Sequence, residues 1–462
     1  MTPSMDDLHA PSDRRSFLKL LGLGAATSAV ALSGCAPRAG QPDGRTGETA
    51  VPTDKMTYRT DPTDGARVSL LGYGCMRLPR RPKAAAKDGA DEIDQEAVNA
   101  SVDYALAHGV NYFDTSPRYC KGQSEHAMGI ALSRHPRDRY LVATKMSNMT
   151  DRSREDSLAM YRRSMQELRV DYFDYYLVHS VGDFDTFKAR YLDNGVLDFM
   201  LAERAAGRIR RLGWSFHGKR EFFDYMMSSG VKWDFVQIQL NYFDWKTALG
   251  RSNVDAKYLY DELARRNIPA IIMEPLLGGR LARPHYKAQA MLKQAAPDAS
   301  VASWAFRFAG SLPGVLTVLS GMTYLEHLQD NLRTFAPLVP LTAADNELLD
   351  RVAQTMLQYQ NINCTGCQYC MPCPYGIDIP GVFAHYNRCL NEGNFPDDTQ
   401  SADYRRARRA FLVGLDRGVP RLRQAQHCTG CGICTRECPQ YIAIPREMER
   451  IDRFVEQLKT DV

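Results

Sequence analysis

Short apolar runs alternate with longer amphipathic segments between residues 67 and 340. The runs are rich in β-branched and aromatic residues, which favours strands. They lie at residues 68–74, 110–115, 140–145, 172–179, 209–216, 235–242, 269–275 and 315–321. Between them, segments such as 94–108 and 156–168 place apolar residues at helical spacing.

Strands that alternate with helices in this way predict an α/β fold, and eight of them are typical of a (β/α)8 TIM barrel. An open doubly wound sheet is the alternative. No G-x-G-x-x-G follows an early strand, so the sequence gives no support for a Rossmann dinucleotide site. We expect the barrel at residues 61–340, after a flexible linker at 36–60, and a small, mainly helical domain at 341–462.

Composition narrows the classes of partner. Of the 462 residues, 44% are hydrophobic and 24% charged, which indicates a soluble globular protein. A net charge of +4 is too small to indicate a nucleic-acid partner, and we expect none. One basic cluster stands out, at Arg405, Arg406, Arg408 and Arg409. It is either a solvated helix face or a docking patch for an acidic electron carrier.

Eight cysteines near the C-terminus form two runs with regular spacing. The runs are Cys364-x2-Cys367-x2-Cys370-x2-Cys373-Pro and Cys428-x2-Cys431-x2-Cys434-x3-Cys438-Pro. The second has the spacing of bacterial ferredoxins, in which the fourth cysteine of each run ligates the other run's cluster; the first is one residue shorter. We therefore expect two [4Fe–4S] clusters, one on Cys364, Cys367, Cys370 and Cys438, the other on Cys428, Cys431, Cys434 and Cys373. Zinc sites or disulfides are the alternatives.

The N-terminal residues are predicted to form an export signal. Arg14-Arg15-Ser16-Phe17-Leu18-Lys19 precedes a weakly apolar run to Leu32 and resembles a twin-arginine export signal. The run is too short and too rich in small residues to span a membrane. Leu32-Ser33-Gly34-Cys35 resembles a lipobox, with ordinary cleavage nearby as the alternative. We expect residues 1–35 to direct the chain to the periplasm or cell envelope, with a lipid on Cys35 as its only membrane attachment.

Polar residues end several predicted strands. Asp114, Lys145 and His179 lie at the ends of the second, third and fourth, and Tyr119 follows in a loop. Barrel enzymes place their chemistry at this rim. A buried lysine beside a carboxylate and a tyrosine would lower the tyrosine's pKa and prepare it to donate or accept a proton. Taken singly, the aspartate could cap a helix, the lysine could be solvated, and the histidine could belong to the core.

Taken together, these residues occur in segments that resemble the aldo-keto reductase family over residues 66–336. The segments are LGYGCMRLP (71–79), GVNYFDTSPRYCKGQSE (109–125), LVATK (141–145), YYLVHS (175–180), GRIRRLGWSF (207–216), MEPLLGG (273–279) and residues 320–331. The resemblance implies a catalytic tetrad of Asp114, Tyr119, Lys145 and His179. The tyrosine would protonate the oxygen of a small carbonyl substrate, or act in reverse on an alcohol, while a nicotinamide exchanges hydride with carbon.

The resemblance also implies a nicotinamide site. Ser215 and Gln237 would bind the carboxamide, and Ser320, Gly321 and Asn331 would lie near the adenosine phosphate. As glycines, Gly278 and Gly279 could let the backbone approach a pyrophosphate; a plain loop is the alternative. Three positions depart from the family pattern: Phe216, Met273 and His327. The last replaces an arginine that would favour NADP, so NADP and NAD both remain open. We expect Arg118, Trp214, His217 and Tyr242 to line the substrate pocket.

The segment CTGCQYCMPCPYGIDIP (364–380) resembles the ferredoxin-like extension of one branch of these reductases. A hydride carries two electrons whereas each cluster passes one, and the sequence shows no flavin signature that would divide the pair. Three hypotheses follow. The chain is a reductase or dehydrogenase with a retained nicotinamide, coupled by its clusters to a redox partner protein; or an electron-transfer protein whose barrel docks a partner; or a reductase with structural clusters.

Overall fold

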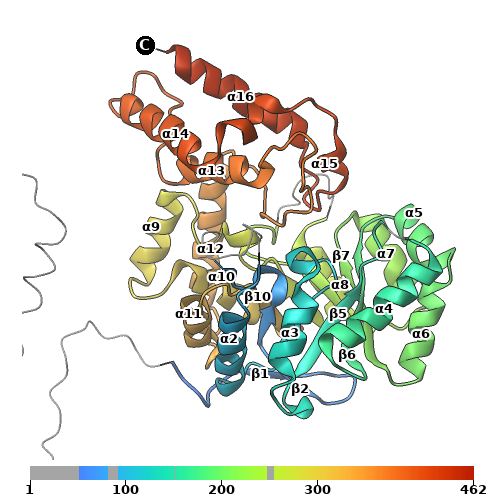
Figure 1. The fold of residues 1–462 in the computed structure, drawn as a ribbon. Helices are drawn as coiled ribbons and strands as arrows, with labels where there is room; N and C mark the ends of the chain where they lie inside the picture. The colour runs from blue at the N-terminus through green and yellow to red at the C-terminus, as the bar shows by residue number, and fades with distance from the viewer. Residues whose placement is uncertain (1–50, 82–91, 151, 247–253, 462) are drawn as a thin grey trace, which may run out of the picture. The chain divides into compact units, whose positions relative to one another are not determined.

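The computed structural model describes residues 51–81, 92–150, 152–246 and 254–461 (Figure 1). The predicted export signal, Cys35 and the first part of the predicted linker lie outside the described residues. Within the described ranges, no helix has both the length and the apolar character needed to cross a membrane.

Eight parallel strands close into a barrel in the order β10-β3-β4-β5-β6-β7-β8-β9. The strands are β3 (Leu71–Gly74), β4 (Tyr112–Asp114), β5 (Leu141–Met146), β6 (Phe173–Val181), β7 (Ile209–Phe216), β8 (Phe235–Gln239), β9 (Ala270–Met273) and β10 (Val315–Ser320). Each predicted apolar run overlaps one of these strands. The expectation of a (β/α)8 barrel is confirmed.

Helices follow the strands and cover the barrel (Figure 1). They are α2 (Gln95–Ala107), α3 (Ser124–Leu132), α4 (Arg154–Leu168), α5 (Phe184–Phe187), α6 (Val196–Ala205), α7 (Arg220–Ser228), α8 (Ala256–Arg265), α9 (Tyr286–Ala295), α10 (Val301–Gly310) and α11 (Leu325–Phe335). Local chemistry fixes several of their ends. Asp94 caps α2 and Ser153 caps α4, each accepting a backbone hydrogen bond from the first turn, and Arg169 ends α4 in a left-handed conformation.

A short hairpin of β1 (Tyr58–Thr60) and β2 (Arg67–Ser69) precedes the barrel. Asp61, in its loop, accepts hydrogen bonds from Tyr175 at 2.5 Å and lies 2.9 Å from the guanidinium of Arg211, both on barrel strands. The predicted linker at residues 36–60 therefore ends too late, because residues 58–60 form strand β1. The contacts that order it come from residues more than a hundred positions away, so the local composition did not reveal them.

The C-terminal part divides into two groups of helices. Helix α12 (Ala343–Leu357) packs on the barrel, because Leu349, Val352 and Met356 belong to the barrel's core. A separate core holds α13 (Ile379–Asn391), α14 (Tyr404–Gly418), the short α15 (Ile433–Arg436) and α16 (Ile444–Thr460). We call this second unit, from Ile362 onward, the cysteine module. The predicted boundary at residue 340 is therefore too early, because α12 joins the barrel.

Candidate functional site

The four predicted tetrad residues converge on one cavity of about 430 Å³, which we call the tetrad cavity. Asp114 ends β4, Lys145 and His179 lie near the ends of β5 and β6, and Tyr119 begins the short helix η3 (Tyr119–Gly122). The Lys145 Nζ donates to Asp114 Oδ1 at 2.6 Å and to the Thr115 carbonyl at 2.8 Å. It lies 4.9 Å from the ring centroid of Tyr119. The tetrad is thus a buried ion pair beside a phenol and an imidazole.

The electrostatic environment of Tyr119 differs from the sequence-based expectation. Burial, followed by the negative charge of Asp114, raises the pKa of Tyr119 well above its usual value. The predicted lowering by Lys145 was wrong. The ammonium is already paired with Asp114, so it does not act on the phenol as an isolated positive charge. Tyr119 therefore stays protonated near neutrality and is suited to donate its proton.

His179 is held by two serines that the sequence analysis missed. Its Nδ1 lies 2.5 Å from Ser147 Oγ and 3.5 Å from Ser116 Oγ, and the two hydroxyls are 2.9 Å apart. Burial and the charge of Lys145 lower the pKa of His179 well below its usual value, so the ring is neutral. When Ser147 donates to Nδ1, the ring proton lies on Nε2, which can donate to a substrate oxygen. Ser116 follows Asp114 by two positions and Ser147 follows Lys145 by two positions, and this spacing is the sequence signal that could have identified them.

Ser147→Ala is expected to lower kcat about tenfold with little change in KM, because the imidazole loses the group that fixes its tautomer. Steady-state kinetics on a carbonyl substrate measures both constants. Ser147→Thr restores the hydroxyl and should recover most of kcat. Ser133→Ala, which removes an exposed hydroxyl bonded to Ile130, is the matched control. An equal loss in the alanine and threonine variants would contradict this role.

All six residues predicted to bind nicotinamide line the tetrad cavity: Ser215, Gln237, Gly278, Ser320, Gly321 and Asn331. The Gln237 Oε1 is buried and, among the described residues, has no hydrogen-bond partner. A buried acceptor without a partner suits an amide donor such as a carboxamide. Ser215 Oγ accepts from the Ser180 amide at 2.7 Å, and Asn331 Nδ2 donates to Ser320 Oγ at 2.9 Å. The polar groups of Ser215 and Gln237 fit a nicotinamide carboxamide, and those of Ser320 and Asn331 fit an adenosine phosphate.

Glu274 is a further ionisable residue of the cavity that sequence analysis did not single out. It follows β9 with a φ of 55° and lines the tetrad cavity. Desolvation raises its pKa to about 7, against the positive charge of Arg77. An acid at this position lies next to Gly278, where a pyrophosphate was expected. The segment MEPLLGG contains the residue but gives no sign that its side chain lines the cavity.

Gly278 lies directly against the cysteine module, which explains why a glycine is needed there. Its φ is 68°, and a Cβ placed on it would lie 2.4 Å from the Cα of Thr365. Arg77 also donates to the Thr365 carbonyl. The glycine therefore gives the module's backbone room to approach the barrel, a use that differs from the predicted approach to a pyrophosphate.

Gly278→Ala is expected to loosen the module from the barrel, because the new methyl group meets backbone atoms that have no flexible end to move. Gly279→Ala is a close control: its φ of 97° is also unfavourable for alanine, but nothing lies within 4 Å of the new atom. Hydrogen exchange of residues 363–380 should therefore rise in the first variant only. Equal exchange in both would show that backbone strain alone matters.

Four predicted cluster ligands from both cysteine runs line one small cavity. These are Cys364, Cys367, Cys370 and Cys438, and apolar residues such as Ile379, Phe383 and Ile442 complete its wall. The structure thus brings together the set expected for one cluster. In the second set, burial, followed by the neighbouring Cys428 and Cys431, raises the pKa of Cys434. Cys373 lies against the same module core as Cys428 and Cys434. Four thiols in an apolar pocket fit a [4Fe–4S] cluster.

Cys389, which lies outside both runs, is buried. Its Sγ is 3.5 Å from the Nε2 of His385 on the same helix, α13. Burial raises the pKa of this thiol to about 11. It is a packed thiol of the module core.

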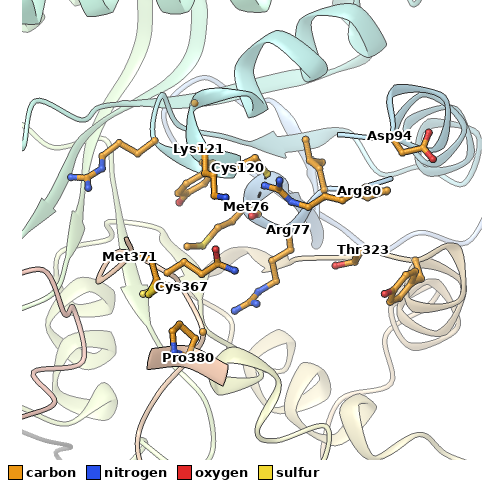
Figure 2. A pocket seen from close by; sticks show the side chains of 18 of the residues that line it. Met76, Arg77, Arg80, Asp94, Cys120, Lys121, Thr323, Cys367, Met371 and Pro380 are labelled. Atoms are coloured by element: carbon orange, nitrogen blue, oxygen red, sulfur yellow. Dashed lines mark hydrogen bonds between the residues drawn. The ribbon is translucent and has the colours of Figure 1, made fainter. Parts of the chain in front are cut away.

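One cysteine of the first set, Cys367, lines the same cavity as the tetrad. Cys367, Tyr369 and Pro439, which follows Cys438, line the tetrad cavity together with Tyr119. A second cavity of about 1590 Å³ adjoins it and has Tyr119, Cys367 and Tyr369 in its wall as well (Figure 2). The module therefore supplies part of the wall around the tetrad.

The four predicted pocket residues divide into two groups. Arg118 lines the larger cavity, with its guanidinium 5.2 Å from the ring centroid of Tyr369, and His217 lines the tetrad cavity. Trp214 is packed among aromatic residues of the core, and the hydroxyl of Tyr242 faces the sulfur of Met356 at 4.0 Å. The last two predictions were wrong, because both side chains point into the layer between barrel and helices.

Comparison with known proteins agrees with this geometry. Residues 70–354 match the aldo/keto reductase family, and residues 363–444 match the 4Fe-4S dicluster domain. The chain is 24% identical over 308 residues to the uncharacterized oxidoreductase YqkF of Bacillus subtilis, which covers 60% of this chain and 90% of that protein. It is 33% identical over 127 residues to probable aldo-keto reductase 1 of Glycine max, covering 26% of this chain and 35% of that protein.

Among solved structures, the aldo-keto reductase AKR11C1 from Bacillus halodurans in its holo form superposes with a TM-score of 0.52. The two chains are 22% identical, and the match covers 64% of this chain and 96% of the other. At that identity the likeness shows the fold alone. The family match spans more than half of the chain and includes all four tetrad positions. The chain therefore belongs to the aldo/keto reductase family of oxidoreductases and carries a 4Fe-4S dicluster domain behind its barrel.

Proposed function

We propose that the protein interconverts a small carbonyl compound and its alcohol with NADP or NAD, and exchanges the electrons with a redox partner through two [4Fe–4S] clusters. One observation carries the proposal: Cys367, a predicted cluster ligand, and Tyr119 line the same cavity. A cluster held by Cys364, Cys367, Cys370 and Cys438 would therefore lie beside the reacting substrate.

The tetrad residues have separate roles in this reaction. The nicotinamide, when bound, supplies or accepts the hydride. Tyr119 gives its proton to the carbonyl oxygen in reduction and recovers it in oxidation. Lys145 and Asp114 form an ion pair next to Tyr119, with Nζ and Oδ1 2.6 Å apart, and this pair keeps both side chains charged and in place. His179, neutral and held through Nδ1, positions the substrate oxygen by hydrogen bonding from Nε2.

Two clusters match the electron count of the reaction. A hydride carries two electrons and one proton. Each [4Fe–4S] cluster would take one electron, so the pair could hold the electrons of one turnover, while the proton would be released to solvent. The second cysteine set lies nearer the surface, since Cys431 is exposed. We assign it to exchange with an external carrier, and the first set to exchange with the tetrad cavity.

The proposed location is outside the cytoplasm. The arginine pair at residues 14 and 15, with the run that follows, supports export by the twin-arginine route, which carries folded proteins with their clusters in place. Cys35 would carry a lipid that holds the mature chain to the membrane.

Glu274 favours a second candidate function, in which this chain is an electron-transfer protein whose barrel docks a partner and binds no nicotinamide. The Glu274 carboxyl group lies close to the predicted pyrophosphate position, and where it is ionised, above its pKa of about 7, it disfavours a dinucleotide. An iron and sulfide assay with EPR, combined with nicotinamide fluorescence of the acid extract, separates the two. About eight irons per chain with bound or titratable nicotinamide supports the first function. The same iron with no nicotinamide uptake would support the second.

A further inference from the structure

The loop that carries Tyr119 has a strained backbone. The three residues after the tyrosine, Cys120, Lys121 and Gly122, have φ values of 53°, 57° and 86°. Residues other than glycine rarely adopt this left-handed region, and a run of such residues persists only where its surroundings hold it. The position of the Tyr119 hydroxyl therefore depends on contacts that its neighbours in the chain make with the rest of the molecule.

The barrel supplies some of these contacts. After Tyr119, the Cys120 thiol lies 3.4 Å from the carbonyl oxygen of Met76, in the segment that follows β3 (Figure 2). Before Tyr119, the Arg118 amide donates to Ser116 Oγ at 3.2 Å. Both contacts tie the loop to the rim of the barrel on either side of the tyrosine.

The Arg118 side chain extends from this loop to the cysteine module. Its guanidinium lies 5.2 Å from the ring centroid of Tyr369, which is a cation–π contact, and 3.9 Å from Glu437 Oε2. On the barrel's side it donates to the sulfur of Met149 at 2.7 Å. Arg118 therefore joins the residue that precedes Tyr119 to two side chains of the module.

Both module contacts lie next to the first set of cysteines. Tyr369 immediately precedes Cys370, and Glu437 immediately precedes Cys438. Cys370 and Cys438 come from different runs, yet they line the same small cavity. The folding of the module around this cavity therefore brings Tyr369 and Glu437 to Arg118 together.

We propose that Arg118 is a positioning residue through which the cysteine module holds Tyr119 in place for proton transfer. The module then serves the reaction of the barrel directly, in addition to carrying electrons. The inference deepens the proposed function and rests on it only in treating Tyr119 as the proton donor. The contact itself requires neither a bound nicotinamide nor turnover.

Hydrogen exchange of residues 116–122 in the full, cluster-loaded protein measures how firmly the loop is held. We expect Arg118→Met to raise this exchange about three- to tenfold, because the variant loses a cation–π contact and a partly exposed ion pair. Arg118→Lys keeps a positive charge near the ring and should restore part of the protection. On the module's side, Tyr369→Leu should raise the exchange, and Tyr369→Phe, which keeps the ring, should restore it.

Arg210→Met is the matched control. Arg210 also lies over a tyrosine, 3.6 Å from the ring centroid of Tyr172, and also near a carboxylate, 3.4 Å from Asp174 Oδ1. It belongs to the N-terminal end of β7, whereas the tetrad lies at the C-terminal ends of the strands. Its loss should therefore leave the exchange of residues 116–122 unchanged.

A kinetic cycle separates positioning from direct contact with the substrate, since Arg118 also lines the larger cavity. If Arg118 acts through Tyr119, Arg118→Met should lower kcat about tenfold with little change in KM. The same substitution should have no further effect on kcat in the Tyr119→Phe background, because the hydroxyl that it positions is already absent. A direct contact with the substrate would instead raise KM in both backgrounds.

Unchanged exchange of residues 116–122 in Arg118→Met and Tyr369→Leu would overturn the proposal, and so would an equal rise in the Arg210→Met control. A rise in KM that persists in the Tyr119→Phe background would assign Arg118 to the substrate, and this too would overturn it. The exchange measurements need no turnover, so failure of the proposed function would be recognised separately.

Discussion

Tyr119→Phe is expected to reduce carbonyl turnover by about 10²- to 10⁴-fold, the usual contribution of a positioned general acid. The variant keeps the ring that packs edge-on to His179 at 6.1 Å between centroids, and loses only the hydroxyl. Because the pKa of Tyr119 is raised, the lost group is a neutral proton donor. Substrate-dependent nicotinamide oxidation measures the loss, and the EPR and absorbance spectra of the clusters should stay unchanged.

Tyr242→Phe is the matched control for this experiment. It removes a hydroxyl that faces Met356 within the core, away from the tetrad cavity. Turnover in the control should remain within about twofold of the wild type, as expected for a substitution outside the catalytic machinery. If Tyr119→Phe were equally active, the tetrad assignment would be wrong.

Cys367→Ala is expected to remove the cluster nearest the tetrad, lowering iron from about eight to about four atoms per chain. Electron exchange between the alcohol substrate and an external one-electron dye should then fall to background, because the surface cluster loses its connection to the cavity. Nicotinamide-linked carbonyl reduction should persist. Iron analysis, EPR and dye reduction measure these three properties.

Cys389→Ala provides the comparison within the same module. This thiol is buried beside His385 and outside both runs, so its loss should leave the iron content and dye reduction unchanged. Full dye reduction by Cys367→Ala, despite loss of half the iron, would remove the first cluster from the electron path.

The barrel was predictable because its strands are buried on both faces and read as continuous apolar runs. The tetrad was predictable for a related reason, since parallel strands bring their carboxyl ends to one rim and Asp114, Lys145 and His179 all occupy such ends. The hairpin at β1 and the attachment of α12 were not predictable. Both depend on contacts with distant residues, such as Asp61 with Arg211.

In the functional site, too, only the features that are local in sequence could be predicted. Cysteine spacing is a local property, and it was enough to group Cys364, Cys367 and Cys370 with Cys438. The pKa of Tyr119 was misjudged because the extent of its burial, the main cause of the raised value, is a three-dimensional property that the sequence does not show. Tyr369 lines the tetrad cavity although it lies some 250 residues after Tyr119 in the sequence. Neither segment contains a pattern that predicts this contact.

The most direct test of the account asks whether the tetrad cavity and the clusters share electrons. Oxidised, cluster-loaded protein is mixed without oxygen with NADPH or NADH, and the cluster absorbance and EPR spectrum are followed. We expect one nicotinamide to reduce two clusters, one electron each, in the wild type, and no reduction of the remaining cluster in Cys367→Ala. Clusters that stay oxidised while the same protein reduces a carbonyl substrate at full rate would contradict the coupling.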